Sequence, residues 1–217
     1  MSKSKQKRKS KKHETDSASV IAKFRSFNLE EGDAIDPLLG VAQTLFPIMG
    51  RVATLISQVR QYKMNHMTIS SSGMATTVKT PLRMISKAVE LKSEIECWKL
   101  PNLPANSKSS SAEDPSFDLN AAVATAEAYR YATLLFLHQT VPEVPSLTSH
   151  SLAENVMMLL ASVPGSSRTL VTHMFPLFVA SCEARPGEER EWAKERWLEL
   201  IEKMWIGTLE RSWEVIK

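Results

Sequence analysis

The side chains that could hold a metal are few and lie far apart in the chain. Cys97 and Cys182 each lack a second cysteine at the CxxC spacing of a zinc site, and the five histidines contain no HxxxH pair. A structural metal site needs about four such ligands close together, so the sequence predicts no bound metal. We expect both cysteines to be small, buried, apolar residues with free thiols.

Nucleophilic chemistry is not indicated either. The chain lacks the GxSxG turn that exposes a catalytic serine, and the segment 165–167 (Gly-Ser-Ser) is better explained as a turn leading into a helix cap. A pairing of Cys182 with a distant histidine is conceivable, but no pattern brings a base to the thiol. No glycine-rich loop that would cradle a phosphate occurs. The sequence therefore predicts no cofactor and no enzymatic activity.

Four side chains are candidates for contact with an effector or a partner: Arg130, Trp197, Trp205 and Trp213. Arg130 could anchor an anionic effector inside a helical bundle, although an ion pair with a nearby acid is the simpler interpretation. On one continuous helix, at about 100° per residue, the three tryptophans would cluster on one side. Core packing is the main interpretation of that stripe. A partner-facing patch is the second, because tryptophan is enriched at interface hot spots.

Charge is distributed unevenly along the chain. Seven of the 27 basic residues fall within residues 1–12, which contain no acid, and the remaining chain carries 20 basic and 24 acidic residues. This mildly acidic body predicts no sequence-specific DNA binding by the chain alone. The run at 5–12 is a candidate nuclear-import patch, with a solvated charge run or a non-specific nucleic-acid tail as alternatives. Its cations are Lys5, Lys7, Arg8, Lys9, Lys11 and Lys12.

Helical periodicity runs through most of the chain, and no segment alternates like a convincing strand. Prolines interrupt the pattern, so we expect the first helix to kink or restart at Pro47 and a later helix to kink at Pro176. The predicted helices cover about 36–62, 80–98, 118–139, 151–161, 166 or 167 through 178, and one continuous charged helix from 188 to 216. Thr80 before Pro81 is expected to cap the second of these, and Ser151 with Glu154 fits a capping box for the fourth.

Composition divides the chain into a tail and one helical domain. Residues 1–19 are rich in lysine and serine and lack large apolar side chains, so we expect them to be disordered. Residues 20–217 are predicted to fold, with a mobile polar linker at about 101–116. No signal peptide is visible, and the longest apolar run, Val156–Ala161, is too short to cross a bilayer. The sequence therefore predicts no membrane span and a reducing compartment.

Four segments carry a resemblance to a known family. They are Ile35–Gly40 with Leu45–Ile48, Glu127–Ala132 continuing to Pro142, His173–Ala184, and Arg190–Trp197 with Met204–Gly207. The last two are the most specific, because an FPLFVASCEA element followed by a tryptophan-rich acidic helix is an unusual combination. Over roughly residues 35–217 the chain resembles the fungal-specific regulatory domain found downstream of six-cysteine binuclear zinc clusters.

The resemblance implies an all-α fold, an irregular multi-helix bundle with kinked helices, in a transcription regulator located in the nucleus. Such a domain acts through protein–protein contacts or small-molecule sensing. The implied partners are transcriptional co-regulators or a zinc-cluster factor, a second copy of the chain in a homodimer, and an apolar small-molecule effector. The alternative is a helical small-molecule-binding protein with no transcriptional role.

The chain also departs from the family pattern. Thr208 stands where the family usually has asparagine, and the six zinc-ligating cysteines have no matching positions among the two cysteines here. The family's last helix normally continues beyond the position of Lys217, so truncation of the domain at its C-terminus is one expectation. Three interpretations stay open: a piece of a longer factor, a mispredicted gene product, and a paralogue without the DNA-reading module.

Overall fold

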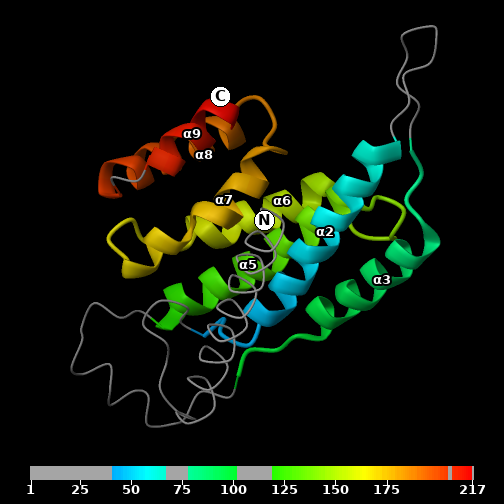
Figure 1. Cartoon of the computed structure of the whole chain (residues 1–217). Coiled ribbons are helices and arrows are strands. Elements are labelled where there is room, and N and C mark those ends of the chain that lie inside the picture. Colours follow the sequence, from blue (N-terminus) through cyan, green and yellow to red (C-terminus); the bar gives the residue numbers. More distant parts are fainter. Residues whose placement is uncertain (1–40, 67–77, 102–118, 205–206, 217) are drawn as a thin grey trace, which may run out of the picture. The chain divides into compact units, whose positions relative to one another are not determined.

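A computed structural model describes residues 41–66, 78–101, 119–204 and 207–216 (Figure 1). These residues form α-helices and one 3-10 helix, η1, and no strand occurs among them. The all-α fold predicted from the sequence is therefore confirmed. The helices are α2 (Phe46–His66), α3 (Leu82–Cys97), α5 (Leu119–Thr140), α6 (Ser149–Ala161), η1 (Arg168–Thr172), α7 (Met174–Ser181), α8 (Glu188–Lys203) and α9 (Gly207–Ile216).

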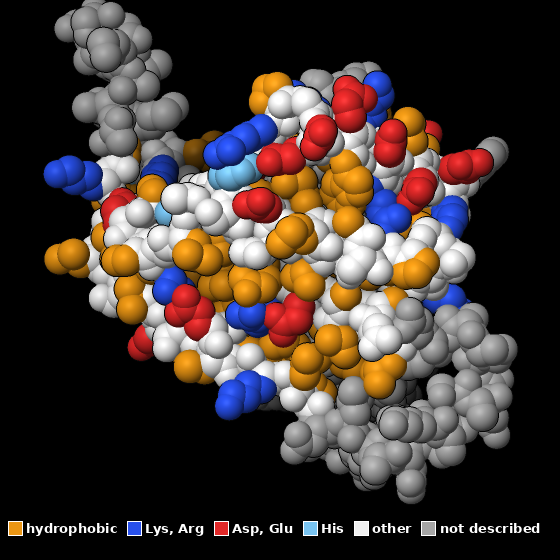
Figure 2. Space-filling model, turned by 180° about the vertical axis from the view of Figure 1, so that it is seen from behind, with side chains coloured by type: hydrophobic (Ala, Val, Ile, Leu, Met, Phe, Trp, Pro, Cys, Tyr) orange, Lys and Arg blue, Asp and Glu red, His pale blue; other side chains and the backbone are white. Residues whose placement is uncertain are grey.

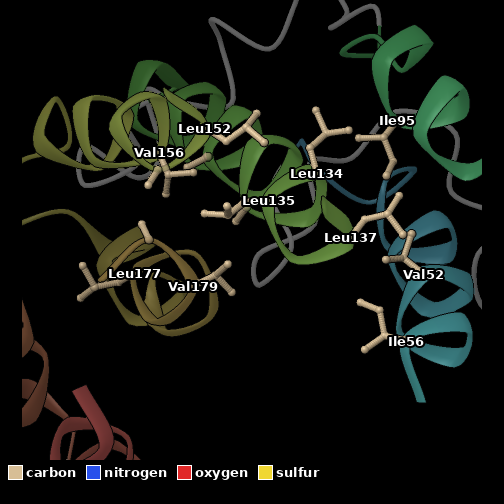
Figure 3. Close-up of a cluster of buried hydrophobic side chains, with 14 of the residues drawn as sticks. Val52, Ile56, Ile95, Leu134, Leu135, Leu137, Leu152, Val156, Leu177 and Val179 are labelled. Atoms are coloured by element: carbon tan, nitrogen blue, oxygen red, sulfur yellow. The ribbon is translucent and has the colours of Figure 1, made fainter. Parts of the chain in front are cut away.

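Helix α5 is the central element of the described fold, because α2, α3, α6, α7 and η1 all pack against it. Its sequence is rich in alanine and leucine, and half of its residues are buried, as expected of a helix that has neighbours on more than one side. Figure 3 shows how its side chains divide between two groups of neighbours. Leu134 and Leu137 point towards α2 and α3, whereas Leu135 points towards α6 and α7.

The two outer groups complete the core on either side of α5. On one side, Val52 and Ile56 of α2 and Ile95 of α3 are almost fully buried, as the helical spacing predicted. On the other side, α6 and α7 contribute side chains such as Leu152 and Leu177. Each fully buried aliphatic side chain stabilises the fold by roughly 1.5 to 3 kcal/mol relative to exposure, so α5 is held from both faces.

Two predicted helix caps differ from the structure by one to three residues. Helix α3 begins after Pro81, and the Thr80 hydroxyl is buried without a hydrogen-bond partner, so Thr80 does not cap it. Helix α6 is capped by Thr148, whose Oγ1 accepts a hydrogen bond from the backbone N–H of Ser151 at 3.1 Å. The predicted capping box of Ser151 with Glu154 is therefore wrong, because a better acceptor stands three residues earlier.

Prolines begin helices here instead of kinking them. Pro47 is the second residue of α2 and Pro176 the third residue of α7, positions where the missing N–H has no intrahelical acceptor. The predicted kink at Pro176 is wrong for this reason. The segment before it forms the separate 3-10 helix η1, and Ser167 caps that helix by accepting from the N–H of Thr169.

The predicted single helix from 188 to 216 is two helices in the structure. Helix α8 ends at Lys203, where Met204 adopts extended backbone angles, and α9 begins at Gly207. Because α8 and α9 are separate helices, α9 packs back on α7 and α8, which one straight helix could not do.

Several sequence predictions fall on parts of the chain that the structure does not describe. These are the tail 1–19 with its import patch, the first helical signals at 36–40, residues 102–116 of the linker, the first residue of the helix predicted at 118–139, and Trp205. Within the described ranges, none of the helices is long and apolar enough to cross a membrane.

Candidate functional site

A cavity of about 310 Å³ lies where the end of α7 and helices α8 and α9 meet. Figure 1 shows α8 and α9 side by side, with α7 next to them. The small side chains of Ala184 and Ala193, both buried, form part of its lining, and Trp213 and Ile216 of α9 form another part. The small side chains of the two alanines take up little of the space between the three helices.

The turn between α7 and α8 sets the geometry of this corner. Pro186 and Gly187 end the preceding segment, and Gly187 has a φ of +107°, a conformation that side chains with a Cβ rarely adopt. The chain reverses there, so Ala184 before the turn and Ala193 after it line the same cavity. The sequence predicted the break at this dipeptide but not the space beside it.

Three charged residues on α8 line the cavity together with these apolar groups. The Lys194 ammonium lies 3.9 Å from the Glu191 carboxylate, so these two charges largely compensate each other. Arg190 has neither an ion pair nor a hydrogen bond from its side chain to any residue that the structure describes. The lining is therefore mainly apolar, with one guanidinium whose charge is not compensated within the cavity.

Trp197 and Trp213 differ in their burial and in their contacts. The indole Nε1 of Trp197 donates to Ser181 Oγ at 3.0 Å, and that hydroxyl in turn donates to the Leu177 carbonyl at 2.6 Å. The Trp197 side chain is fully buried, so in this structure it packs in the core and presents no face to a partner. Trp213 is partly buried and lines the cavity, next to Ser181.

Arg130 lies elsewhere, on α5. Its guanidinium forms an ion pair with Glu127 at 2.7 Å and stacks 4.4 Å from the centre of the Tyr131 ring. Burial disfavours the charge of Arg130, but the hydrogen bond and the charge of Glu127 outweigh it and raise the pKa. Its charge is thus compensated by a neighbour one turn earlier, which matches the simpler of the two sequence interpretations.

A buried hydrogen-bond network connects α5 with the residue between η1 and α7. His173 is fully buried, and its Nε2 lies 3.1 Å from the hydroxyl of Thr125. Since that hydroxyl donates to the Ala121 carbonyl at 2.7 Å, it must accept from the Nε2–H of His173. Burial, and secondly the charge of Arg196, lower the pKa of His173 to about 3, so the imidazole is neutral at physiological pH. This network ties α5 to η1 and α7.

Arg196 of α8 forms hydrogen bonds with the end of α6. It is 8% exposed, and its Nη2 donates to the carbonyls of Leu160 and Val163 at 2.7 and 2.5 Å. Its Nη1 binds the Glu199 carboxylate at 2.8 Å. These bonds fasten α8 to the end of α6, so the helix that carries Arg190 and Lys194 is held at a fixed position beside the cavity. The sequence analysis did not single out Arg196.

Both cysteines are exposed and free, which contradicts the prediction that they are buried. Each stands at the end of a helix, Cys97 as the last residue of α3 and Cys182 directly after α7. Surrounding protein atoms, and then the charge of Glu183, raise the pKa of the Cys182 thiol. A raised pKa keeps sulfur protonated, which disfavours a nucleophilic role. Among the described residues no group of three or more potential metal ligands comes together.

The surface seen from behind carries interleaved charges. Figure 2 shows acidic and basic side chains of this face lying near one another among apolar ones, with no extended basic patch among its coloured residues. A duplex-binding surface would need clustered Lys and Arg side chains to neutralise phosphates. This face therefore does not have the charge pattern of a DNA-binding surface.

Comparison with known proteins places the chain in a family. The model of the fungal-specific transcription factor domain matches residues 3–217, which is nearly the whole chain. The chain belongs to this family. This match confirms the family predicted from the four segments. The family is a transcription regulatory domain and is not typically enzymatic, so membership supports a role for the chain in transcription regulation.

One curated relative comes from Neurospora crassa. The chain is 28% identical over 134 residues to the acriflavine sensitivity control protein acr-2, a match that covers 59% of this chain and 21% of that protein. The chain thus spans about a fifth of the length of this relative. No solved structure matches the chain.

The cavity draws on the two segments in which the resemblance is strongest. Ser181 and Ala184 belong to the segment 173–184, and the charged residues and Ala193 belong to the segment 190–197. Sequence reasoning found Trp213 by its residue type and missed Arg190 and both alanines. The two alanines could not have been found from a local pattern, because the cavity depends on which side chains meet across three helices.

Proposed function

We propose that this fungal-specific transcription factor domain regulates transcription in the nucleus through contacts with other proteins, under the control of a small apolar molecule. The observation that carries the ligand part is the largely apolar cavity that both α8 and α9 line. A cavity of this kind is the usual form of a small-molecule site, with apolar walls and a few polar groups. The regulatory part rests on family membership over residues 3–217.

The charge of the chain favours protein contacts over direct DNA reading. The chain from residue 13 onwards is acidic on balance, and the cations that could attract phosphate are concentrated in residues 1–12. Sequence-selective recognition would therefore come from a partner or from a zinc-cluster module. Co-regulators, a zinc-cluster factor and a second copy of the chain are the partner classes that we propose.

A tethering experiment tests the regulatory role. The full chain is fused to an unrelated DNA-binding domain, and transcription of a reporter carrying that domain's sites is measured in a fungal host. We expect the fusion to change reporter output several-fold, up or down, relative to the DNA-binding domain alone. Output equal to that of the DNA-binding domain alone would contradict the regulatory role and favour a ligand-binding protein without a transcriptional role.

Two variants show whether the effect needs the folded domain. Leu135→Asp places a carboxylate at a fully buried position of α5, where an unpaired charge is not tolerated, and should abolish the effect. Val89→Asp makes the same kind of change at a position of α3 that is 47% exposed and should leave the effect unchanged.

A further inference from the structure

We propose that the cavity between α7, α8 and α9 binds a small molecule with an apolar body and a single anionic group, an inference that rests on the proposed ligand control. The cavity measures about 310 Å³, near the lower end of the range of roughly 300 to 1,000 Å³ that ligand pockets occupy. It is too small for a folded peptide segment and large enough for a short alkyl or monocyclic acid.

The lining specifies an apolar body. Trp213 and Ile216 of α9 face the cavity together with Ala184 and Ala193. The Ser181 hydroxyl is already engaged, because it accepts from Trp197 and donates to Leu177, so it offers no strong donor to a ligand. A ligand gains free energy here mainly by removing indole and aliphatic surface from water.

The charges favour an anion over a neutral or cationic group. Lys194 and Glu191 compensate each other, which leaves the Arg190 guanidinium as the lining charge without a partner in the described part of the chain. A guanidinium presents two parallel N–H donors that match the two oxygens of a carboxylate. A ligand ammonium would instead meet two cations and one already paired carboxylate.

Binding at this place would couple to the position of α9. The apolar body would contact Trp213 and Ile216 on α9, while the anionic group would contact Arg190 on α8. A ligand that makes both contacts binds only the state in which α9 is docked, so it shifts the population towards that state. The surface that a partner protein meets around α9 would then depend on ligand concentration.

Three ligands of equal chain length test the proposal on the full chain. Octanoate, octanol and octylamine are titrated, and binding is followed by displacement of the fluorescent apolar anion anilinonaphthalene sulfonate and by the thermal unfolding midpoint. We expect octanoate to bind at least fivefold more tightly than octanol, and octylamine to bind most weakly. Octylamine binding as tightly as octanoate, or no binding of any of the three at millimolar concentration, would overturn the proposal.

Single variants locate the site. Arg190→Gln should weaken octanoate at least fivefold and leave octanol unchanged, whereas Trp213→Ala should weaken both. The matched control is Arg211→Gln, at an exposed position of α9 that does not line the cavity, and it should change neither. Each variant is first required to unfold cooperatively at a temperature close to that of the wild type. Octanoate affinity unaffected by Arg190→Gln would reject the assignment of the anion contact.

The outcome separates this inference from the proposed function. If the tethered chain regulates the reporter but binds none of the three ligands, the cavity assignment fails and the regulatory role stands. If the ligands bind as expected but the tethered chain has no effect, the cavity assignment stands and the regulatory role fails.

Discussion

At the residue scale, His173 shows how a polar side chain is accommodated in the core. Its Nε2–H donates to Thr125, while its Nδ1 is buried without a hydrogen-bond partner. An imidazolium at this place would have to donate from both nitrogens, lose its water and face the charge of Arg196. The neutral form is therefore a condition for the native packing of η1 and α7.

This condition predicts a defined pH dependence of stability. The pKa of His173 is about 3 in the folded protein against 6.5 as its ordinary value. Below pH 6.5 the His173 side chain binds a proton in the unfolded chain but not in the folded protein. The free energy of unfolding therefore decreases as the pH falls from 6.5 towards 3. The loss from this group approaches about 1.4 kcal/mol per pH unit at its steepest.

The prediction is checked by urea unfolding at several pH values between 7 and 4. His173→Gln retains a donor towards Thr125 but has no proton to gain, so its free energy of unfolding should vary less with pH than that of the wild type. His66→Gln, at the exposed end of α2, serves as the matched control and should retain the wild-type dependence. Equal pH dependence in all three proteins would show that His173 is not buried in its neutral form.

At the element scale, Arg196 acts as a cap that one helix provides for another. The last turn of a helix leaves its carbonyls without intrahelical donors, and here the guanidinium of α8 binds the Leu160 carbonyl of α6 and the Val163 carbonyl just beyond it. Arg196→Met keeps the apolar stem but removes both donors. Because the Val163 carbonyl then loses its Arg196 donor, while the Leu160 carbonyl keeps the bond from the backbone N–H of Val163, the free energy of unfolding should decrease by about 1 to 3 kcal/mol.

The control for this variant is Arg51→Met. Arg51 pairs with Glu94 across α2 and α3, but both side chains are well exposed to solvent, so the loss should be much smaller. Chemical denaturation of the two variants in the same buffer measures the difference. A similar loss in both would mean that water, and not Arg196, satisfies the end of α6.

The sequence predicted elements well where periodicity alone decides and poorly where tertiary contacts decide. Helix α3 was predicted because apolar residues recur at helical spacing, and Ala88, Leu91 and Ile95 are indeed buried. Helix α5 was predicted because its sequence consists largely of good helix formers such as alanine and leucine. The division between α8 and α9 was missed, since good helix formers run up to Lys203 and the apolar stripe continues beyond it. Packing of α9 against α7 overrides that local preference, and Gly207 was the available signal.

The candidate site was only partly predictable for a related reason. Trp213 was found because a tryptophan on an amphipathic helix is conspicuous, whereas Ala184 and Ala193 carry no signal of their own. A cavity depends on which side chains meet across three helices, and no local sequence pattern indicates that space will be left between them. Arg190 looked like one charge among many until the structure showed that Lys194 pairs with Glu191 and Arg190 pairs with no described residue.

At the scale of the whole molecule, charge separates residues 1–12 from the rest of the chain. We propose that the six cations from Lys5 to Lys12 are a nuclear-import patch, with a solvated charge run and a non-specific nucleic-acid tail as the alternatives, and one variant tests this proposal. In this tail variant all six become glutamine, and it is fused to fluorescent proteins large enough to prevent passive entry into the nucleus. We expect the wild-type fusion to accumulate in fungal nuclei and the tail-variant fusion to remain outside.

The same pair of proteins tests whether the chain reads DNA sequence. Because the rest of the chain is acidic on balance, any duplex binding should come from the tail, be equal for unrelated sequences, and weaken steeply with salt. With seven cations available, the slope of log affinity against log salt concentration should be no steeper than about −6, and the tail variant should lose most of it. Binding that survives in the tail variant and prefers one sequence would show that the helical body contacts bases, and would refute recognition through a partner.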